Sequence, residues 1–134
     1  MNQERAVLIV SCRPENRKTL VRVFDELSIN SYVASRIRDA MEVLASQPLS
    51  ISMVFCEERV SDGSYSELLK TVRATWPETR FVVTLCTGEW EEYLQAMRLG
   101  AQEVLRCPVR PTDIDLVLIR AMKQNDRKAM TANA

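Results

Sequence analysis

The stretch VFCEERVSDGSYSELL, residues 54–69, carries the signals that decide the fold. It begins with an apolar run of β-forming residues, passes through a turn that contains Gly63, and continues into a segment whose apolar side chains recur at helical spacing. This order is typical of a buried strand that leads through a short turn into a helix. The apolar run ends in Cys56 and Glu57, which makes Glu57 the residue of this stretch to examine for a functional role.

The same unit recurs along the rest of the chain. Apolar runs without polar alternation, which are typical of strands buried on both faces, alternate with segments of helical periodicity. Strands that alternate with helices indicate β-α-β units, a parallel sheet covered on both faces, and an α/β domain. The predicted strands are 6–10, 31–35, 51–56, 81–85 and 103–107.

Capping signals predict where the helices begin and end. Proline suits a first helical turn or follows a helix, serine and threonine cap amino ends, and glycine follows carboxyl ends. The predicted markers are Pro14 in the first helix, Pro48 after the second, Ser64 with Glu67 and Pro77 for the third, Thr87, Leu99 and Gly100 for the fourth, and Thr112 with Asp115 for the last.

Length and composition fit one folded domain and exclude several classes of function. The chain has 134 residues, 46% hydrophobic and 27% charged, which argues against disorder. Its 18 basic residues balance its 18 acidic residues, so the net charge gives no footprint for nucleic acid or an anionic membrane. The chain has no histidine, which excludes histidine bases and ligands. The apolar run at 6–10 is too short for a signal peptide or a membrane span, so we expect a cytoplasmic protein.

Every cysteine lies at the carboxyl end of a different predicted strand. The four are Cys12, Cys56, Cys86 and Cys107. Ligands of open α/β sheets bind at this edge, so the cysteines lie where a site is expected. No pair has CxxC spacing, so the sequence has no standard zinc or redox motif, and cytoplasmic thiols are expected to be reduced.

Three segments resemble the receiver domain of bacterial response regulators, over nearly the whole chain. VLIVSCRPENRKTL (7–20) resembles the family's VLIVDDEPxxR, CEERVSDGSYSELL (56–69) resembles CDxxLPDGSGLELL, and AMRLGAQEVLRCPV (96–109) resembles AxxxGAxDYLxKPF. With the strand pattern, the resemblance implies a flavodoxin-like, doubly wound (βα)5 sandwich with a parallel five-stranded sheet in the order 2-1-3-4-5. The receiver-like domain is expected over 1–124, with a polar, frayed tail at 125–134.

The resemblance also assigns roles to single positions. The family holds Mg²⁺ with an acidic pair, accepts phosphate on an aspartate, steadies it with a lysine, and switches through a hydroxyl and an aromatic residue. The corresponding positions here are Ser11 and Cys12 for the metal pair, Glu57 for the phosphoacceptor, Cys107 for the lysine, Leu85 (or Thr87, with a shorter loop) for the hydroxyl, and Val104 for the aromatic residue.

These departures predict that the family's chemistry is lost. Phosphoryl transfer depends on positioning and on neutralising charge with metal and cation, and a thiol is a poor ligand for Mg²⁺. The sequence therefore predicts a non-catalytic pseudo-receiver that works through protein–protein contacts, with no Mg²⁺ and no other cofactor. Nothing in it resembles a phosphate-binding loop, and a flavin role would rest on the fold alone.

Two alternative functions follow from the same positions. A conventional receiver would be weakly phosphorylated at Glu57, or a fixed charge there would keep the domain active. In the simplest interpretation, Glu57 is solvated and pairs with Arg13 or Arg59. A thiol-based sensor would use Cys12 and Cys107, through a disulfide or, with all four cysteines, a metal. Otherwise the cysteines are small buried apolar residues, and Cys56 faces away from the pocket by strand alternation.

The expected partners are signalling proteins, with no role for nucleic acid or a membrane. In receivers the fourth helix, the fifth strand and the fifth helix form the usual partner surface, and a homodimer through this face is plausible. An exposed aromatic residue can anchor such a contact. The candidate contact residues are Trp90, Tyr93, Arg106 and Arg110.

Overall fold

The structure is a computed structural model that describes residues 5–46 and 51–132, with side chains up to residue 124. The predicted marker Pro48 lies outside the described residues. The long strands are β1 (Ala6–Val10), β2 (Asn30–Ala34), β3 (Ile51–Glu57), β6 (Arg80–Leu85) and β7 (Glu103–Arg106). The helices are α1 (Pro14–Glu26), α2 (Ile37–Ser46), α3 (Tyr65–Thr75), α4 (Trp90–Arg98) and α5 (Pro111–Ala132).

The five long strands form one parallel sheet. Their order is β2-β1-β3-β6-β7, and each neighbouring pair is parallel. This is the predicted flavodoxin-like order, because β6 and β7 are the fourth and fifth strands of the sequence pattern. The carboxyl ends of β1, β3, β6 and β7 therefore meet at one edge of the sheet.

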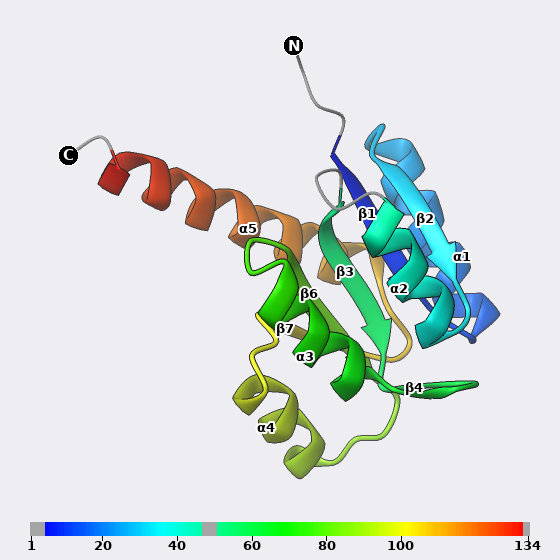
Figure 1. Cartoon of the computed structure of the whole chain (residues 1–134). Coiled ribbons are helices and arrows are strands. Elements are labelled where there is room, and N and C mark those ends of the chain that lie inside the picture. The colour runs from blue at the N-terminus through cyan, green and yellow to red at the C-terminus, as the bar shows by residue number, and fades with distance from the viewer. Residues whose placement is uncertain (1–4, 47–50, 133–134) are drawn as a thin grey trace.

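Helices cover both faces of the sheet (Figure 1). One apolar cluster lies between the sheet and α2, α3 and α4, and includes Leu8, Val54 and Leu69. The other lies between the sheet and α1 and α5, and includes Phe24 and Phe55. Because successive strand residues face opposite clusters, each position at the strand ends is assigned to one face.

A small antiparallel hairpin follows β3 where the sequence predicts only a turn. Its strands are β4 (Arg59–Val60) and β5 (Gly63–Ser64). Gly63 has a φ of 156°, which disfavours residues with a side chain. At the tip of the hairpin, the Asp62 carboxylate accepts the backbone N–H groups of Ile37 (2.7 Å) and Arg38 (3.0 Å). The hairpin thus caps α2 from a distant part of the chain.

Several predicted caps are wrong. The N-cap of α4 is Glu89 and not Thr87, whose hydroxyl is bound to Glu58 at 3.2 Å instead. Ser64 does precede α3, but its Oγ lies 2.8 Å from Ser66 Oγ and makes no capping bond. Thr112 lies inside α5, because the helix already begins at Pro111, a residue well suited to a first turn.

The carboxyl ends of two helices differ in how well they were predicted. Gly100 follows the end of α4 with a φ of 107°, as expected of a residue just after a helix. The expected frayed tail from residue 125 continues α5 as far as Ala132, and α5 extends beyond the sheet (Figure 1). The domain boundary at 124 stays a prediction.

Among the described residues, no helix combines the length and apolarity needed to cross a bilayer.

Candidate functional site

The candidate site lies at the carboxyl edge of the sheet, where the chain leaves four parallel strands. Ser11 and Cys12 follow β1, Glu57 ends β3, and Cys86 and Cys107 follow β6 and β7. Asn16, on the first turn of α1, reaches over this edge and contacts both Glu57 and the two cysteines. Asn16 is the residue that the sequence interpretation missed.

The Glu57 carboxylate is buried and fully engaged in hydrogen bonds. Only 3% of the residue is exposed. Its Oε1 accepts the backbone N–H of Cys12 at 3.0 Å, and its Oε2 accepts the Ser11 hydroxyl and Asn16 Nδ2, the latter at 3.4 Å. A buried carboxylate is costly unless such donors replace water, so these three residues are what allow a charge at this position.

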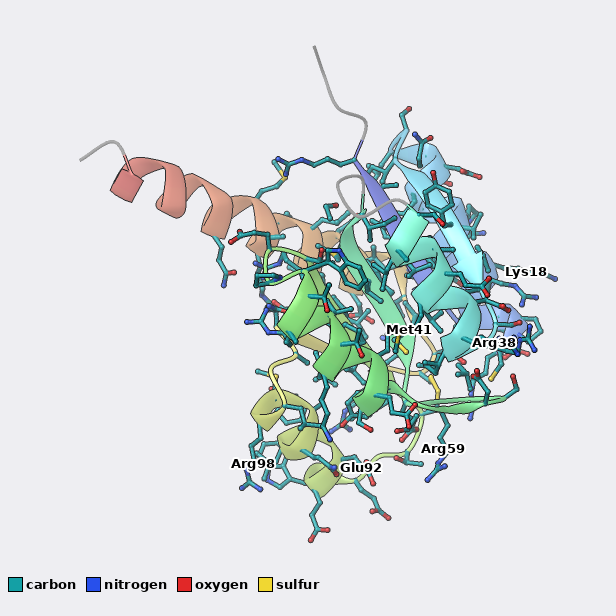
Figure 2. All side chains as sticks on the ribbon, viewed as in Figure 1. Lys18, Arg38, Met41, Arg59, Glu92 and Arg98 are labelled. Atoms are coloured by element: carbon teal, nitrogen blue, oxygen red, sulfur yellow. A yellow bond between two sulfur atoms is a disulfide. The ribbon has the colours of Figure 1, made fainter. Side chains whose placement is uncertain are left out.

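The simplest interpretation of Glu57 is wrong. It is not solvated, and within the described residues it forms no ion pair with Arg13 or Arg59. Arg59 extends from the β4–β5 hairpin towards solvent (Figure 2). The carboxylate is instead bound by donors from the segment that follows β1 and from the first turn of α1.

The residues present do not fit a Mg²⁺ site. Magnesium prefers hard oxygen ligands in an octahedral arrangement. Here Ser11 and the Cys12 backbone donate hydrogen bonds to Glu57, so both positions present protons rather than lone pairs to the carboxylate. Over residues 5–46 and 51–124, no three Cys, Asp or Glu side chains converge as potential metal ligands.

A disulfide joins Cys86 to Cys107 across the ends of β6 and β7. Their Cα atoms are 4.8 Å apart, because Leu85 and Arg106, the preceding residues, are partners in the sheet. The alternative of a Cys12–Cys107 disulfide is therefore wrong. Strand β7 pairs with β6 and not with β1, so Cys86 is the neighbour of Cys107. The Cys107–Pro108 peptide bond is cis.

Asn16 links the carboxylate to the disulfide. Its Nδ2 lies 3.1 Å from Cys107 Sγ and 3.9 Å from Cys86 Sγ, in addition to its contact with Glu57. Its Oδ1 accepts the backbone N–H of Val109 at 3.3 Å, which holds the start of the β7–α5 connection. One buried amide thus contacts each part of the edge.

The two remaining cysteines have different surroundings. Cys12 is exposed, and its thiol lies 3.5 Å from Glu57 Oε1. Burial and the Glu57 carboxylate raise the pKa of the Cys12 thiol. Cys56 is fully buried in the cluster under α2 and α3, which confirms that it faces away from the pocket. Burial raises the pKa of the Cys56 thiol strongly.

The three positions that correspond to the family's switch residues lie outside the contacts that join Glu57, Asn16 and the disulfide. Leu85 is buried in the cluster on the α2–α3 face, and Val104 packs against the same cluster. Thr87 is exposed and bound to Glu58. The neighbour that does face Asn16 from the end of β6 is Cys86.

Glu58 fastens the loop after β6. Its carboxylate accepts the backbone N–H groups of Cys86 (2.8 Å) and Thr87 (3.1 Å), and the Thr87 hydroxyl. A carboxylate bound to consecutive backbone N–H groups makes strong, charge-assisted hydrogen bonds. The connection between β6 and α4 is therefore held by Glu58, directly after β3, as well as by the disulfide.

The candidate partner surface lies beside this loop. Trp90, the first residue of α4, is 63% exposed and stacks on Tyr93 with ring centroids 5.2 Å apart. Tyr93 is half-buried and packs against the cluster on this face. Arg106 ends β7 just before Cys107, and Arg110 lies at the end of the connection that follows; both are exposed. Arg98 on α4 is also exposed and projects outwards (Figure 2).

Comparison with known proteins points to one family. No family model matches the chain. The response regulator protein PilR of Pseudomonas aeruginosa is 27% identical over 109 residues, which make up 81% of this chain and 24% of PilR. The chain thus spans about a quarter of the length of this curated relative.

Solved structures share the fold at low sequence identity. A response regulator receiver domain protein from Clostridium thermocellum has a TM-score of 0.82 at 17% identity, covering 91% of this chain and 97% of that one. The signal receiver domain of an HD domain-containing protein from Pseudomonas fluorescens Pf-5 has a TM-score of 0.84 at 16% identity, covering 97% and 95%. The chain therefore has the fold of response regulator receiver domains, and its sequence is similar to part of PilR.

Proposed function

We propose that this receiver domain works without phosphorylation and without Mg²⁺, through contacts with signalling proteins. One observation carries the proposal: both oxygens of the buried Glu57 carboxylate accept hydrogen bonds, from Ser11, Cys12 and Asn16. A phosphoacceptor needs a free carboxylate oxygen beside a cation. Here the neighbours at the metal positions are hydrogen-bond donors, and a sulfur of a disulfide replaces the lysine.

The proposed output is a signalling surface that does not respond to phosphate. A carboxylate that is permanently buried cannot report the presence of phosphate, because its surroundings do not change between two states. The surface available to a partner includes Trp90 and Tyr93 on α4, with Arg106 and Arg110 on either side of the neighbouring loop. We propose this surface for a signalling protein or for a second copy of the chain, in the cytoplasm.

Phosphoryl uptake tests the proposal directly. The chain would be incubated with acetyl phosphate and Mg²⁺, and its intact mass would be followed beside that of a receiver with the acidic pair, aspartate and lysine. We expect a gain of one phosphoryl group in that receiver and none here. A gain that disappears in Glu57→Gln would overturn the proposal and establish a weakly phosphorylated receiver.

Self-association tests the surface. Sedimentation velocity over a concentration series would compare the wild type with Trp90→Ser and with Val33→Ser, a control at an exposed apolar residue of β2. If the α4 face joins two copies, Trp90→Ser removes the dimer and Val33→Ser does not. A dimer that persists in Trp90→Ser places the interface elsewhere, and a monomer throughout leaves a different protein as the partner.

A further inference from the structure

We propose that Cys86 and Cys107 form a reversible thiol–disulfide couple that is oxidised by low-molecular-weight disulfides and controls the mobility of the loop before α4. The inference deepens the proposed function, because that loop leads into the surface proposed for partners. The disulfide ties the β6–α4 connection (86–89) to the β7–α5 connection (107–110).

The sheet holds the two sulfurs together whether or not they are bonded. Leu85 pairs with Arg106 in the ladder, and the backbone N–H of Cys107 donates to the carbonyl of Leu85 at 2.9 Å. Glu58 fixes the backbone of Cys86 from the other side. The reduced thiols therefore stay adjacent, so the bond can close without a search through the unfolded chain.

The couple is accessible, and its surroundings favour one sulfur as the nucleophile. Both cysteines are half-buried and lie next to the exposed residues Thr87 and Pro108, so a small reagent reaches them. Asn16 Nδ2 points at Cys107 Sγ from 3.1 Å, and an N–H donor stabilises negative charge on sulfur. Cys107 is therefore the sulfur that carries the thiolate.

The other two cysteines do not share these properties. Cys56 is fully buried. Cys12 is exposed, but it lies beside the Glu57 carboxylate, which opposes a second negative charge. The selectivity of the couple follows from position in the sheet rather than from exposure alone.

The chemical step is thiol–disulfide exchange. The Cys107 thiolate attacks a low-molecular-weight disulfide, which forms a mixed disulfide at Cys107 and releases one thiolate. The Cys86 thiol loses its proton and attacks the Cys107 sulfur, which forms the internal bond and releases the second thiolate. In total, two protein thiols are oxidised and one external disulfide is reduced to two thiols.

Opening the bond removes the one covalent link between the two connections. Glu58 still holds Cys86 and Thr87, so the loop keeps its place at the sheet edge. The segment 88–90 loses its tether through Cys86 to β7, and Trp90 begins α4 immediately after it. Reduction is therefore expected to loosen the start of α4 while the sheet and Glu57 stay in place.

The first experiment measures the couple itself. Cells that produce the chain are quenched in acid, free thiols are alkylated, and the tryptic peptides 81–98 and 107–120 are quantified as linked or alkylated. The purified chain is then equilibrated in mixtures of reduced and oxidised glutathione. We expect linkage that rises and falls with the glutathione ratio, is lost in Cys86→Ser and in Cys107→Ser, and is kept in the control Cys12→Ser. Linkage that is absent at every ratio, or that joins Cys107 to Cys12, would overturn the proposal.

The second experiment measures the consequence. Hydrogen exchange of segments 86–98 and 107–110 is compared between the oxidised and reduced wild type, with Cys86→Ser/Cys107→Ser as the permanently open form. We expect reduction to remove protection at 88–93 in the wild type and to change nothing in the double variant. Equal exchange in both redox states would show that the disulfide forms without controlling the loop, which contradicts the proposal.

The two proposals fail separately. Uptake of phosphate from acetyl phosphate would reject the phosphorylation-independent function and leave the glutathione titration unchanged. Absence of the disulfide would reject the redox couple and leave the mass after acetyl phosphate treatment unchanged.

Discussion

The two halves of the sheet edge hold their polar groups in different ways. On the β1–β3 side, a buried carboxylate is held by hydrogen bonds from Ser11, Cys12 and Asn16. On the β6–β7 side, a covalent bond joins Cys86 to Cys107. The Asn16 amide contacts both halves.

This difference separates a fixed half from a variable half. Water could replace the hydrogen-bond donors of Glu57 only if the buried carboxylate became exposed. The β1–β3 half therefore has one arrangement. In the proposed thiol–disulfide exchange, a reagent opens the Cys86–Cys107 bond and leaves the hydrogen bonds to Glu57 in place. If the phosphate chemistry is missing, as proposed, the disulfide is the position of this edge that changes state.

Breaking the covalent half has the largest expected effect. A disulfide across a separation of 21 residues limits the unfolded chain, so reduction should lower the free energy of unfolding by about 3 kcal/mol. Urea unfolding with and without a phosphine reductant measures the loss. In Cys86→Ser/Cys107→Ser the reductant should have no effect. Identical midpoints for the reduced and oxidised wild type would mean that the bond contributes nothing to stability.

Breaking the amide that joins the halves has the next largest effect. Asn16→Leu keeps the size of the side chain but leaves the Val109 N–H without its acceptor and removes one donor from Glu57. We expect a loss of about 2 kcal/mol in urea unfolding. Thr19→Val on the same helix is the control, since the Thr19 hydroxyl bonds only the carbonyl of Glu15. Equal stability of Asn16→Leu and wild type would show that the link is dispensable.

A site outside the pocket sharpens the comparison through its pH dependence. The backbone N–H groups of Arg38 and Ile37 lower the pKa of Asp62. Because this pKa is lowered in the folded state, the Asp62 carboxylate stabilises the fold at pH values above the ordinary pKa of an aspartate. This contribution is lost as the pH falls through the folded-state pKa. At neutral pH, Asp62→Ala should lower the melting temperature by less than Asn16→Leu does. The difference in melting temperature between Asp62→Ala and the wild type should shrink in acid. Asp39→Ala on α2, whose carboxylate pairs with Arg36 at 3.0 Å near the surface, should have a smaller effect. A loss of melting temperature in Asp62→Ala that persists in acid would exclude the capping role.

The smallest effect concerns the reactivity of Cys12. Burial and the Glu57 carboxylate raise the Cys12 pKa, so its rate of alkylation by iodoacetamide should rise only at more alkaline pH than for an unfolded thiol. Because a raised pKa favours the thiol in the folded state, this contribution to stability is present at neutral pH and is lost as the pH rises through the folded-state value. Glu57→Gln should move the alkylation profile towards lower pH. With the disulfide closed and Cys56 buried, mass spectrometry assigns the reaction to Cys12; an unmoved profile would show that Glu57 does not act on this thiol.

Local pattern predicted the fold better than it predicted the site. The apolar runs at 6–10, 51–56 and 81–85 form strands because continuous burial on both faces is visible in sequence. Thr87 failed as a cap because Glu58, distant in sequence, binds its hydroxyl. Asn16 carried no signal, since a single asparagine after a proline is ordinary in a first helical turn.

The alternation of strands and helices and the placement of each cysteine at a strand end can be predicted from residue order alone, as can the absence of the receiver family's acidic pair, aspartate and lysine. Strand alternation also predicts that Cys56 faces away from Glu57. The strand order implied by the resemblance already places the fifth strand beside the fourth, but the bond between Cys86 and Cys107 became evident only in the folded chain. The burial of Glu57 depends on what α1 brings over the strand ends, and this long-range contact leaves no trace in residue spacing.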